Sequence, residues 1–388
     1  SVFEDRDGDG RHGRGEPGIV GVAQSNGRTL AITDAHGHYR LPVSPGQTVF
    51  AIKPAGWRLP GSDPARPGAW RHLPTAASSK PSMALNYGGI AAGSWPDRFD
   101  VAMRRAPADD GWLEVRVFAD PQVKSTADVG YYARDIVDSV LSEAGDARRT
   151  PELGLSLGDI VDDKLDLYPA LNAETRRIGV PWLHVSGNHD LDFDAARDED
   201  SLQTFRNSFG PDTFAWEEHG AVFVGLDDVI YRPGGSPAYI GGLREDQFAF
   251  LEAYLPHVPK TGLLVLAVHI PLFEQDGRDT FRDADRARLF ALLRDFPKVL
   301  ILSGHNHSQQ HWMHDARTVW QGTEPLHEYN VGAACGAYWT GVKDAAGIPD
   351  TTMSDGTPNG YASLGIDRDG RYALGWHAAR DPQDSQIG

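Results

Sequence analysis

Five short polar segments of the chain contain the carboxylate, amide and imidazole side chains that commonly bind metal ions. The segments are Asp120-Pro121-Gln122, Gly158-Asp159-Ile160-Val161-Asp162, Gly187-Asn188-His189-Asp190, His269 and Gly304-His305-Asn306-His307. Two metal ions about 3.5–4 Å apart lower the pKa of a shared water toward neutrality and hold phosphoryl oxygens during in-line displacement. The five segments therefore predict one dinuclear metal site whose chemistry is the attack of water on phosphate esters.

Each polar segment follows an apolar run that has the composition of a buried strand. The runs cover residues 112–118, 153–157, 181–185, 263–268 and 299–302. Segments with apolar residues near helical spacing lie between them, at about 127–144, 165–178, 243–255 and 283–294. Alternating strands and helices predict an α/β layer fold, in which ligands bind at the carboxyl ends of the strands.

Residues from about 112 to 331 resemble the calcineurin-like metallophosphoesterase family. The resemblance rests on the order of the five segments, above all on the GNHD sequence that begins at Gly187 and the GHNH sequence that begins at Gly304. It implies a metallophosphoesterase-type four-layer β-sandwich flanked by helices. It also implies hydrolysis of phosphate esters by a hydroxide that bridges two divalent or trivalent ions of the Mn, Fe, Zn or Mg class.

The same resemblance assigns roles to the polar residues. His189 is expected to hold or protonate phosphate oxygens, and Asp190 is expected to orient His189. The implied metal ligands are Asp120 and His307 for the first ion, Asp159 for both ions, and Asn188, His269 and His305 for the second ion.

Gln122 departs from the family pattern, which usually has a histidine two residues after the first aspartate. An amide oxygen is a neutral and weaker donor than imidazole, so Gln122 predicts a looser or more hydrated first metal position. Some family members with accessory domains resemble this Asp-Pro-Gln sequence. We therefore interpret Gln122 as a candidate ligand of the first ion and as the mark of a subgroup.

A second metal-binding pattern lies near residue 5. Asp5, Asp7, Asp9, Arg11 and Glu16 occupy positions 1, 3, 5, 7 and 12 of the calcium-loop template, with a backbone carbonyl expected from Arg11. Glycine stands at position 6, as the template requires. The flanking residues have no helical pattern, so the sequence predicts a calcium loop attached to β structure. The alternative is an acidic turn that binds no ion.

The chain divides into four predicted regions: a β-sandwich module with the calcium loop (1–53), a Pro/Gly-rich irregular connection (54–110), the catalytic domain (111–333) and a carboxy-terminal accessory β module (334–388). In the first region, short β-like runs are predicted at 19–23, 29–33, 38–43 and 48–52. We expect the connection to pack on the catalytic domain and to line its mouth. In the last region, a hairpin is predicted from 361–366 and 372–376. The end of the chain, 381–388, has no closing element, so we expect a truncated module.

Aromatic residues near the start of the last region are candidate substrate contacts. Tyr338 and Trp339 are the strongest of them. Their rings could hold a choline-like cation or stack on a base or a sugar. The alternative is that these rings pack in the core or between regions.

Composition limits the partners and the compartment. The net charge of −17 argues against nucleic acid as the main partner, whereas small phosphate esters are compatible with it because bound metals supply local positive charge. Cys335 is the only cysteine, so no intramolecular disulfide is possible. The sequence contains no predicted transmembrane segment, and it does not specify the oligomeric state. The calcium loop and the β module favour a periplasmic or secreted protein.

The residues leave several functions open. The first is a dinuclear metallophosphoesterase, with a slight preference for phosphodiesters of small or lipid-derived headgroups because accessory modules can narrow the cleft. The second is a phosphomonoesterase or nucleotidase. The third, of a different class, is a calcium-stabilised surface-binding protein without catalysis. The intact GNHD and GHNH segments favour an enzyme.

Overall fold

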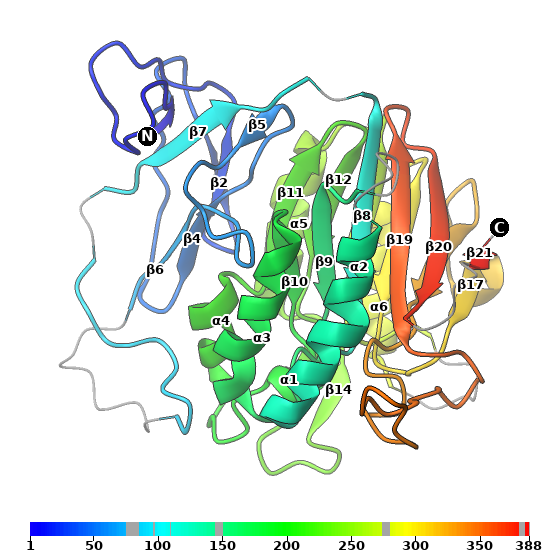
Figure 1. The fold of residues 1–388 in the computed structure, drawn as a ribbon. Coiled ribbons are helices and arrows are strands. Elements are labelled where there is room, and N and C mark those ends of the chain that lie inside the picture. Colours follow the sequence, from blue (N-terminus) through cyan, green and yellow to red (C-terminus); the bar gives the residue numbers. More distant parts are fainter. Residues whose placement is uncertain are drawn as a thin grey trace.

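Two six-stranded sheets form the centre of the molecule (Figure 1). The computed structural model describes residues 1–74, 85–95, 98–108, 110–143, 150–273, 280–379 and 385–387. The first sheet has the order β10 (Trp182–Val185), β9 (Leu153–Leu157), β8 (Trp112–Phe118), β19 (Gly360–Asp367), β20 (Tyr372–Ala378) and β21 (Ser385–Ile387). The second has the order β11 (Phe214–Glu218), β12 (Ala221–Gly225), β15 (Leu263–Ala267), β16 (Val299–Ser303), β18 (Leu326–Asn330) and β17 (Gln310–His314).

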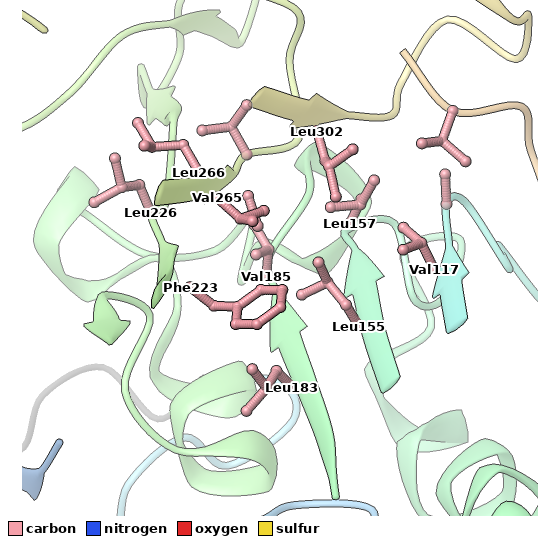
Figure 2. Packing of buried hydrophobic residues seen from close by; sticks show 14 of the residues in the cluster. Val117, Leu155, Leu157, Leu183, Val185, Phe223, Leu226, Val265, Leu266 and Leu302 are labelled. Carbon is pink, nitrogen blue, oxygen red and sulfur yellow. The ribbon is translucent and has the colours of Figure 1, made fainter. Parts of the chain in front are cut away.

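The five predicted strands lie side by side in parallel in the two sheets. β8, β9 and β10 pair in parallel in the first sheet, and β15 and β16 pair in parallel in the second. β9, β10, β15 and β16 are mainly apolar, as expected for strands covered on both faces, whereas β8 also carries Glu114 and Arg116, which form a buried ion pair. Figure 2 shows how Leu155 and Val185 of the first sheet pack with Phe223 and Val265 of the second, with every one of these side chains buried. This contact between the sheets is the main core.

Helices connect the parallel strands and form the outer layers of the fold. They are α1 (Thr126–Tyr132), the π-helical turn η1 (Ala133–Val137), α2 (Asp138–Ser142), α3 (Tyr168–Thr175), α4 (Gln203–Phe209), α5 (Glu245–Tyr254) and α6 (Asp283–Leu293). The four predicted helices are confirmed, although the first contains the π-helical turn and its predicted last residue, 144, lies outside the described residues. The predicted four-layer architecture is therefore confirmed. None of the described helices is long and apolar enough to cross a membrane.

The amino-terminal region forms two small sheets, as predicted for a β-sandwich. One has the order β1 (Val2–Glu4), β7 (Val101–Arg105) and β5 (Trp57–Arg58), and the other has the order β3 (Leu30–Ile32), β2 (Ala23–Ser25), β4 (Thr48–Ala51) and β6 (Trp70–His72). Three of these strands, β5, β6 and β7, come from the 54–110 segment. The prediction that this segment is irregular was wrong, because short strands among Pro and Gly residues carry little periodic signal.

Two of the predicted amino-terminal strands also differ from the structure. Ladder pairing begins only at Ala23, since Gly21 adopts a left-handed φ of 82° within a turn just before it. Residues 38–43 form no strand and have no ladder partner among the described residues. Their position is fixed by side-chain contacts instead, such as the bond from the Tyr39 hydroxyl to the Phe99 carbonyl at 2.8 Å.

Buried contacts attach the amino-terminal region to the catalytic domain. The ring of Phe50 on β4 lies 6.0 Å from that of Phe250 on α5. Buried Lys53 forms an ion pair with Glu218 at 2.7 Å. Farther along, the Trp182 amide donates to the Pro64 carbonyl at 2.8 Å. The expectation that this part of the chain packs on the catalytic domain agrees with these contacts.

The carboxy-terminal hairpin belongs to the central fold. β19 and β20 pair as predicted, and β19 also pairs in antiparallel fashion with β8 along six residues, from Ala362 opposite Val117 to Asp367 opposite Trp112. The predicted carboxy-terminal β module is therefore present, and its hairpin completes the edge of the first sheet beside β8. Residues 380–384 and 388, on which the expected truncation depends, lie outside the described residues.

Candidate metal centre

The predicted metal ligands meet where the parallel strands of both sheets end. Asp120 follows β8, Asp159 follows β9, Asn188 follows β10, His269 follows β15, and His305 and His307 follow β16. The side chains of Asp120, Asp159 and His269 are almost completely buried. Because the two sheets face each other, their carboxyl edges bring together residues that lie far apart in the chain.

The backbone at these positions is strained. Left-handed φ angles, which L residues rarely adopt, occur at Asp120 (47°), Gln122 (42°), Asp159 (47°), His305 (73°) and His307 (47°). Such strain is typical of sites where the surrounding fold over-determines a conformation. Here each tight turn directs a polar side chain from the end of a strand toward the junction of the sheets.

Three possible ligand atoms converge around the Nε2 atom of His269. It lies 3.3 Å from Asp159 Oδ1, 3.0 Å from Asn188 Oδ1 and 3.2 Å from His305 Nδ1. His269 Nδ1 donates to the Leu157 carbonyl at 2.8 Å, which leaves the Nε2 lone pair facing these oxygens and the second imidazole. Lone pairs this close to one another repel unless a proton or a metal ion lies between them. The donor set therefore fits a metal ion with mixed nitrogen and oxygen ligands.

The charges of the protein alone agree with this interpretation. Burial disfavours the imidazolium of His269, but the nearby Asp159 carboxylate outweighs it and raises the pKa of His269 to about 10. Burial and the positive charge on His269 together lower the pKa of His305 to about 4. The cluster thus holds positive charge at its centre, in the place where a metal ion would replace a proton.

A second group of donors surrounds Asp120. His307 Nε2 lies 3.5 Å from Asp120 Oδ1, and the His305 amide donates to Asp120 Oδ2 at 3.0 Å. His307 Nδ1 is bonded to the Gly336 carbonyl at 2.7 Å, so Nε2 is the nitrogen available to an ion. A backbone carbonyl on the other ring nitrogen is the usual way in which a metal-binding histidine is oriented.

Gln122 lies beside this second group. Its amide nitrogen is 3.3 Å from Asp162 Oδ1, and its Oε1 accepts a weak bond from the Cys335 thiol at 3.8 Å. The same sulfur lies 3.8 Å from His307 Nδ1. Gln122 is therefore adjacent to the predicted first ion, but its side-chain oxygen is directed at Cys335. Its role as a ligand stays a prediction.

Two glycines, which have no side chain, leave space for the metal centre. A Cβ on Gly187 would lie 2.2 Å from Asp159 Oδ1, and a Cβ on Gly158 would lie 2.6 Å from His269 Nδ1. Real Cβ contacts are not this short. The loops after β9 and β10 can approach each other and the second sheet only because glycine stands at both positions. The glycines of the polar segments thus have a steric role.

His189 lies beside the two groups of ligands, at the solvent side. Its Nδ1 is 2.8 Å from Asp163 Oδ1 and 3.1 Å from Asp162 Oδ1, and its backbone amide donates to Asp159 Oδ1 at 2.8 Å. Burial lowers the pKa of His189, but the surrounding carboxylates outweigh this effect and raise it to about 9. Metal ions bound beside Asp159 would oppose this rise in the pKa of His189, because their positive charge disfavours a protonated ring.

The structure differs from the expectation that Asp190 orients His189. The buried Asp190 carboxylate accepts bonds from the Tyr168 hydroxyl at 2.8 Å, the Gly187 amide at 2.8 Å and the Ile160 amide at 3.2 Å. It joins the loops after β9 and β10. Burial, followed by the charge of Asp159, raises the pKa of Asp190 to about 7. The carboxylates that contact the ring of His189 are Asp162 and Asp163.

Comparison with known proteins identifies the family. The model of the calcineurin-like phosphoesterase matches residues 115–309, about half of the chain, and the model of its carboxy-terminal domain matches residues 328–388. The chain belongs to the calcineurin-like phosphoesterase family. It is accordingly a metal-dependent phosphoric ester hydrolase, and the resemblance seen in the sequence is confirmed. No curated protein matches it significantly.

Solved structures of phosphatases are similar to this chain. A purple acid phosphatase, PPD1, from yellow lupin (Lupinus luteus) seeds has the same fold: it is 12% identical and superposes with a TM-score of 0.53 over 94% of this chain and 68% of that one. A dimetal phosphatase from Danio rerio is 15% identical, with a TM-score of 0.46 over 71% of this chain and 99% of that one.

The two predicted substrate contacts of this phosphoesterase lie in different environments. Tyr338 is 47% exposed, and its ring lies 4.4 Å from that of His307. Trp339 is buried, and its indole N–H donates to the Pro121 carbonyl at 2.8 Å. Trp339 therefore packs beneath the loop that carries Asp120, in agreement with the packing alternative. Tyr338 stays the candidate for contact with substrate.

Several residues of the site were not assigned a role from the sequence. Asp163 was detectable as the neighbour of Asp162 in the second polar segment. Asp228, whose carboxylate accepts the His269 and Ile270 amides at 3.0–3.1 Å, follows β12, a strand that was not predicted. Tyr87, whose hydroxyl donates to the Asp163 carbonyl at 2.9 Å, has no sequence signal because it lies in the connection.

The predicted calcium residues form a compact loop at the amino terminus. Carboxylate oxygens of Asp5, Asp7 and Glu16 all lie within 4.8 Å of one another. Asp9 Oδ1 accepts the Arg11 amide at 2.7 Å, which closes a short turn. Asp5, Asp7 and Glu16 are thus brought together, whereas Asp9 supports the turn.

The close approach at Gly187 predicts that a single methyl group disrupts the metal centre. We expect Gly187→Ala to lower the metal content from two ions to less than one ion per chain, because the Cβ would displace the Asp159 carboxylate. Gly187 has an ordinary φ of −118°, so the effect is steric. The control is Gly130→Ala on α1, where no neighbouring atom lies within 4 Å of the added Cβ. Elemental analysis after dialysis measures the content, and two ions in Gly187→Ala would contradict the prediction.

Proposed function

We propose that this phosphoesterase hydrolyses phosphodiesters of small or lipid-derived headgroups. The observation that carries the proposal is the convergence of two donor groups, around Asp120 and His269, beside a histidine held by two carboxylates. The residues that would hold the ions are Asp120, Gln122 and His307 for the first, Asp159 for both, and Asn188, His269 and His305 for the second. When bound, two such ions supply a hydroxide at neutral pH and neutralise charge on the phosphoryl oxygens.

His189 is the residue suited to assist the leaving group. Asp162 and Asp163 hold its Nδ1, so Nε2 is the nitrogen that can deliver a proton to the departing alkoxide. The Asp162 and Asp163 carboxylates beside Nδ1 favour the protonated form of the ring, which is the form a general acid requires. Asp190 would contribute only indirectly, because it fixes the loops that carry Asp159 and His189 and does not contact the His189 ring.

Accessory segments on both sides of the site support the preference for diesters. Tyr87, from the amino-terminal connection, is bonded to the backbone of Asp163 next to His189. Tyr338, from the carboxy-terminal region, lies against His307. These two exposed aromatic rings, which come from different segments of the chain, would provide surfaces for the two substituents of a phosphodiester. A monoester has only one substituent to place, so a phosphomonoesterase or nucleotidase is the alternative.

A paired assay tests the proposal. After reconstitution with Mn, Fe, Zn or Mg, we expect kcat/KM for bis(p-nitrophenyl) phosphate to exceed kcat/KM for p-nitrophenyl phosphate. In a second assay, we expect the enzyme to hydrolyse natural headgroup diesters. The reverse order would favour the monoesterase, and nucleotide esters would then be the next substrates. Asp159→Ala, which lacks the bridging carboxylate, is the control. Equal turnover in this variant would remove the metal mechanism.

The role of His189 has a separate test. We expect His189→Asn to retain both metal ions and to lower kcat by about 10²–10⁴, the usual contribution of a general acid. Metal content by elemental analysis and steady-state kinetics on the preferred aryl ester measure the two properties. The effect should shrink for esters of strongly acidic phenols, whose leaving groups need no proton. Unchanged kcat on a poor leaving group would contradict the role.

We also propose that the loop formed by Asp5, Asp7, Asp9, Arg11 and Glu16 binds calcium and that the protein is periplasmic or secreted. Millimolar calcium is expected to raise the melting temperature of wild-type protein but not of Asp7→Ala. A dissociation constant of about 10⁻⁴–10⁻³ M would fit an extracytoplasmic module. Differential scanning fluorimetry and calorimetric titration measure both. No shift in wild type would leave the loop as an acidic turn, and a submicromolar constant would contradict the proposed compartment.

A further inference from the structure

A cavity of about 880 Å³ lies in the amino-terminal region, outside the metal centre. Its floor includes Ile32 of β3, Val49 of β4 and Arg71 of β6. Its walls come from residues 38–41 and 43 and from Trp95, Arg98 and Phe99. This volume is within the range of pockets that hold small ligands.

The cavity is on the face of the four-stranded sheet that is turned away from the catalytic domain. Val49 pairs with Arg71, and the next pair along the two strands is Phe50 with Trp70. Successive side chains of a strand point to opposite faces. Phe50 and Trp70 lie on the other face, where together with Trp182 of the catalytic domain they line a small pocket. Val49 and Arg71 therefore face the cavity.

Apolar side chains are unusually exposed in this cavity. Ile32 is 42% exposed, Val43 is 38% exposed and Trp95 is 39% exposed. The Trp95 ring is held in place because its N–H donates to the Pro74 carbonyl at 2.9 Å. Three exposed large apolar side chains that line one cavity form a patch that a ligand could cover. A ligand that fills this cavity would therefore need an apolar part.

The charged side chains of the cavity are mainly cationic, although the whole chain carries −17. Arg40, Arg71 and Arg98 all line it. Arg98 lies 3.7 Å from the Asp100 carboxylate, whereas Arg40 and Arg71 form no ion pair with any described residue. The acidic lining residue, Asp34, accepts the His36 and His38 amides of its own turn on its Oδ1 atom. Two guanidinium groups are thus available to an anion.

We infer that the cavity binds a small amphipathic anion, a molecule with one acidic group and an apolar chain or ring. Arg40 and Arg71 hold the acidic group, because guanidinium groups present several N–H donors to an oxyanion. Ile32, Val43 and Trp95 cover the apolar part. The inference does not depend on the proposed substrate, and it gives the amino-terminal region a binding role separate from the metal centre.

Calorimetric titration of the intact metal-loaded protein with octanesulfonate tests the inference, because a sulfonate is not a phosphate ester and cannot be hydrolysed. We expect one binding site per chain, with a change in tryptophan fluorescence that is absent in Trp95→Phe. Arg40→Gln/Arg71→Gln should weaken binding by about tenfold or more through loss of charge-assisted bonds. Butanesulfonate should bind about tenfold more weakly than octanesulfonate, because it buries fewer methylene groups.

Matched variants separate binding in the cavity from binding elsewhere on the surface. Arg14→Gln removes an exposed arginine of the same region that does not line the cavity, and it should bind as wild type does. The melting temperatures of the arginine variants should equal that of wild type, because both side chains are exposed. Octanesulfonate that does not bind to wild type would overturn the inference, and so would equal octanesulfonate binding to wild type and Arg40→Gln/Arg71→Gln. In a parallel sedimentation assay, binding to anionic lipid vesicles without binding to octanesulfonate would also overturn it. Aryl phosphodiester turnover is measured in parallel, so failure here leaves the proposed function untouched.

Discussion

The close approach of the loops that follow the parallel strands is the constraint on which the rest of the structure depends. Gly187 lies so near Asp159 that no side chain fits between them, and Gly158 has the same relation to His269. This contact places carboxylate and imidazole groups from both sheets within hydrogen-bonding distance of one another. The left-handed backbone at Asp120, Asp159 and His305 is a further cost of the arrangement. A well-packed core between the sheets balances that cost.

Buried carboxylates hold this strained arrangement together. Asp190 bonds amides of two loops and the Tyr168 hydroxyl, and Asp228 bonds the amides of His269 and Ile270. Each carboxylate satisfies backbone donors that tight turns leave without partners. Asp162 and Asp163 act differently, because they contact the His189 ring at the solvent side. The acidic residues of the site therefore fall into three groups: the predicted ion ligands, the residues that fix loops and the residues that contact the His189 ring.

The segments outside the matched catalytic region contribute to both the fold and the site. β19 pairs with β8, the strand that leads to Asp120, so the carboxy-terminal hairpin supports the first metal position. Tyr87 and Tyr338 reach the metal centre from opposite ends of the chain. The amino-terminal sheets contact the catalytic domain through one face and form a cationic cavity with the other. The proposed substrate preference and the proposed ligand site thus both rest on the parts of the chain that are least regular in sequence.

The sequence by itself determined the reaction class, the parallel strands and the residues that converge on the metal centre. It could do so because buried parallel strands are continuous apolar runs, and because ligands at strand ends form short, ordered motifs. It did not reveal the strands within 54–110, whose two- to five-residue lengths leave almost no periodicity. Nor did it show that Asp163 rather than Asp190 contacts the ring of His189, or that Trp339 is buried beneath Pro121 while Tyr338 is exposed. Those choices depend on side-chain direction and long-range packing, which only the tertiary structure decides.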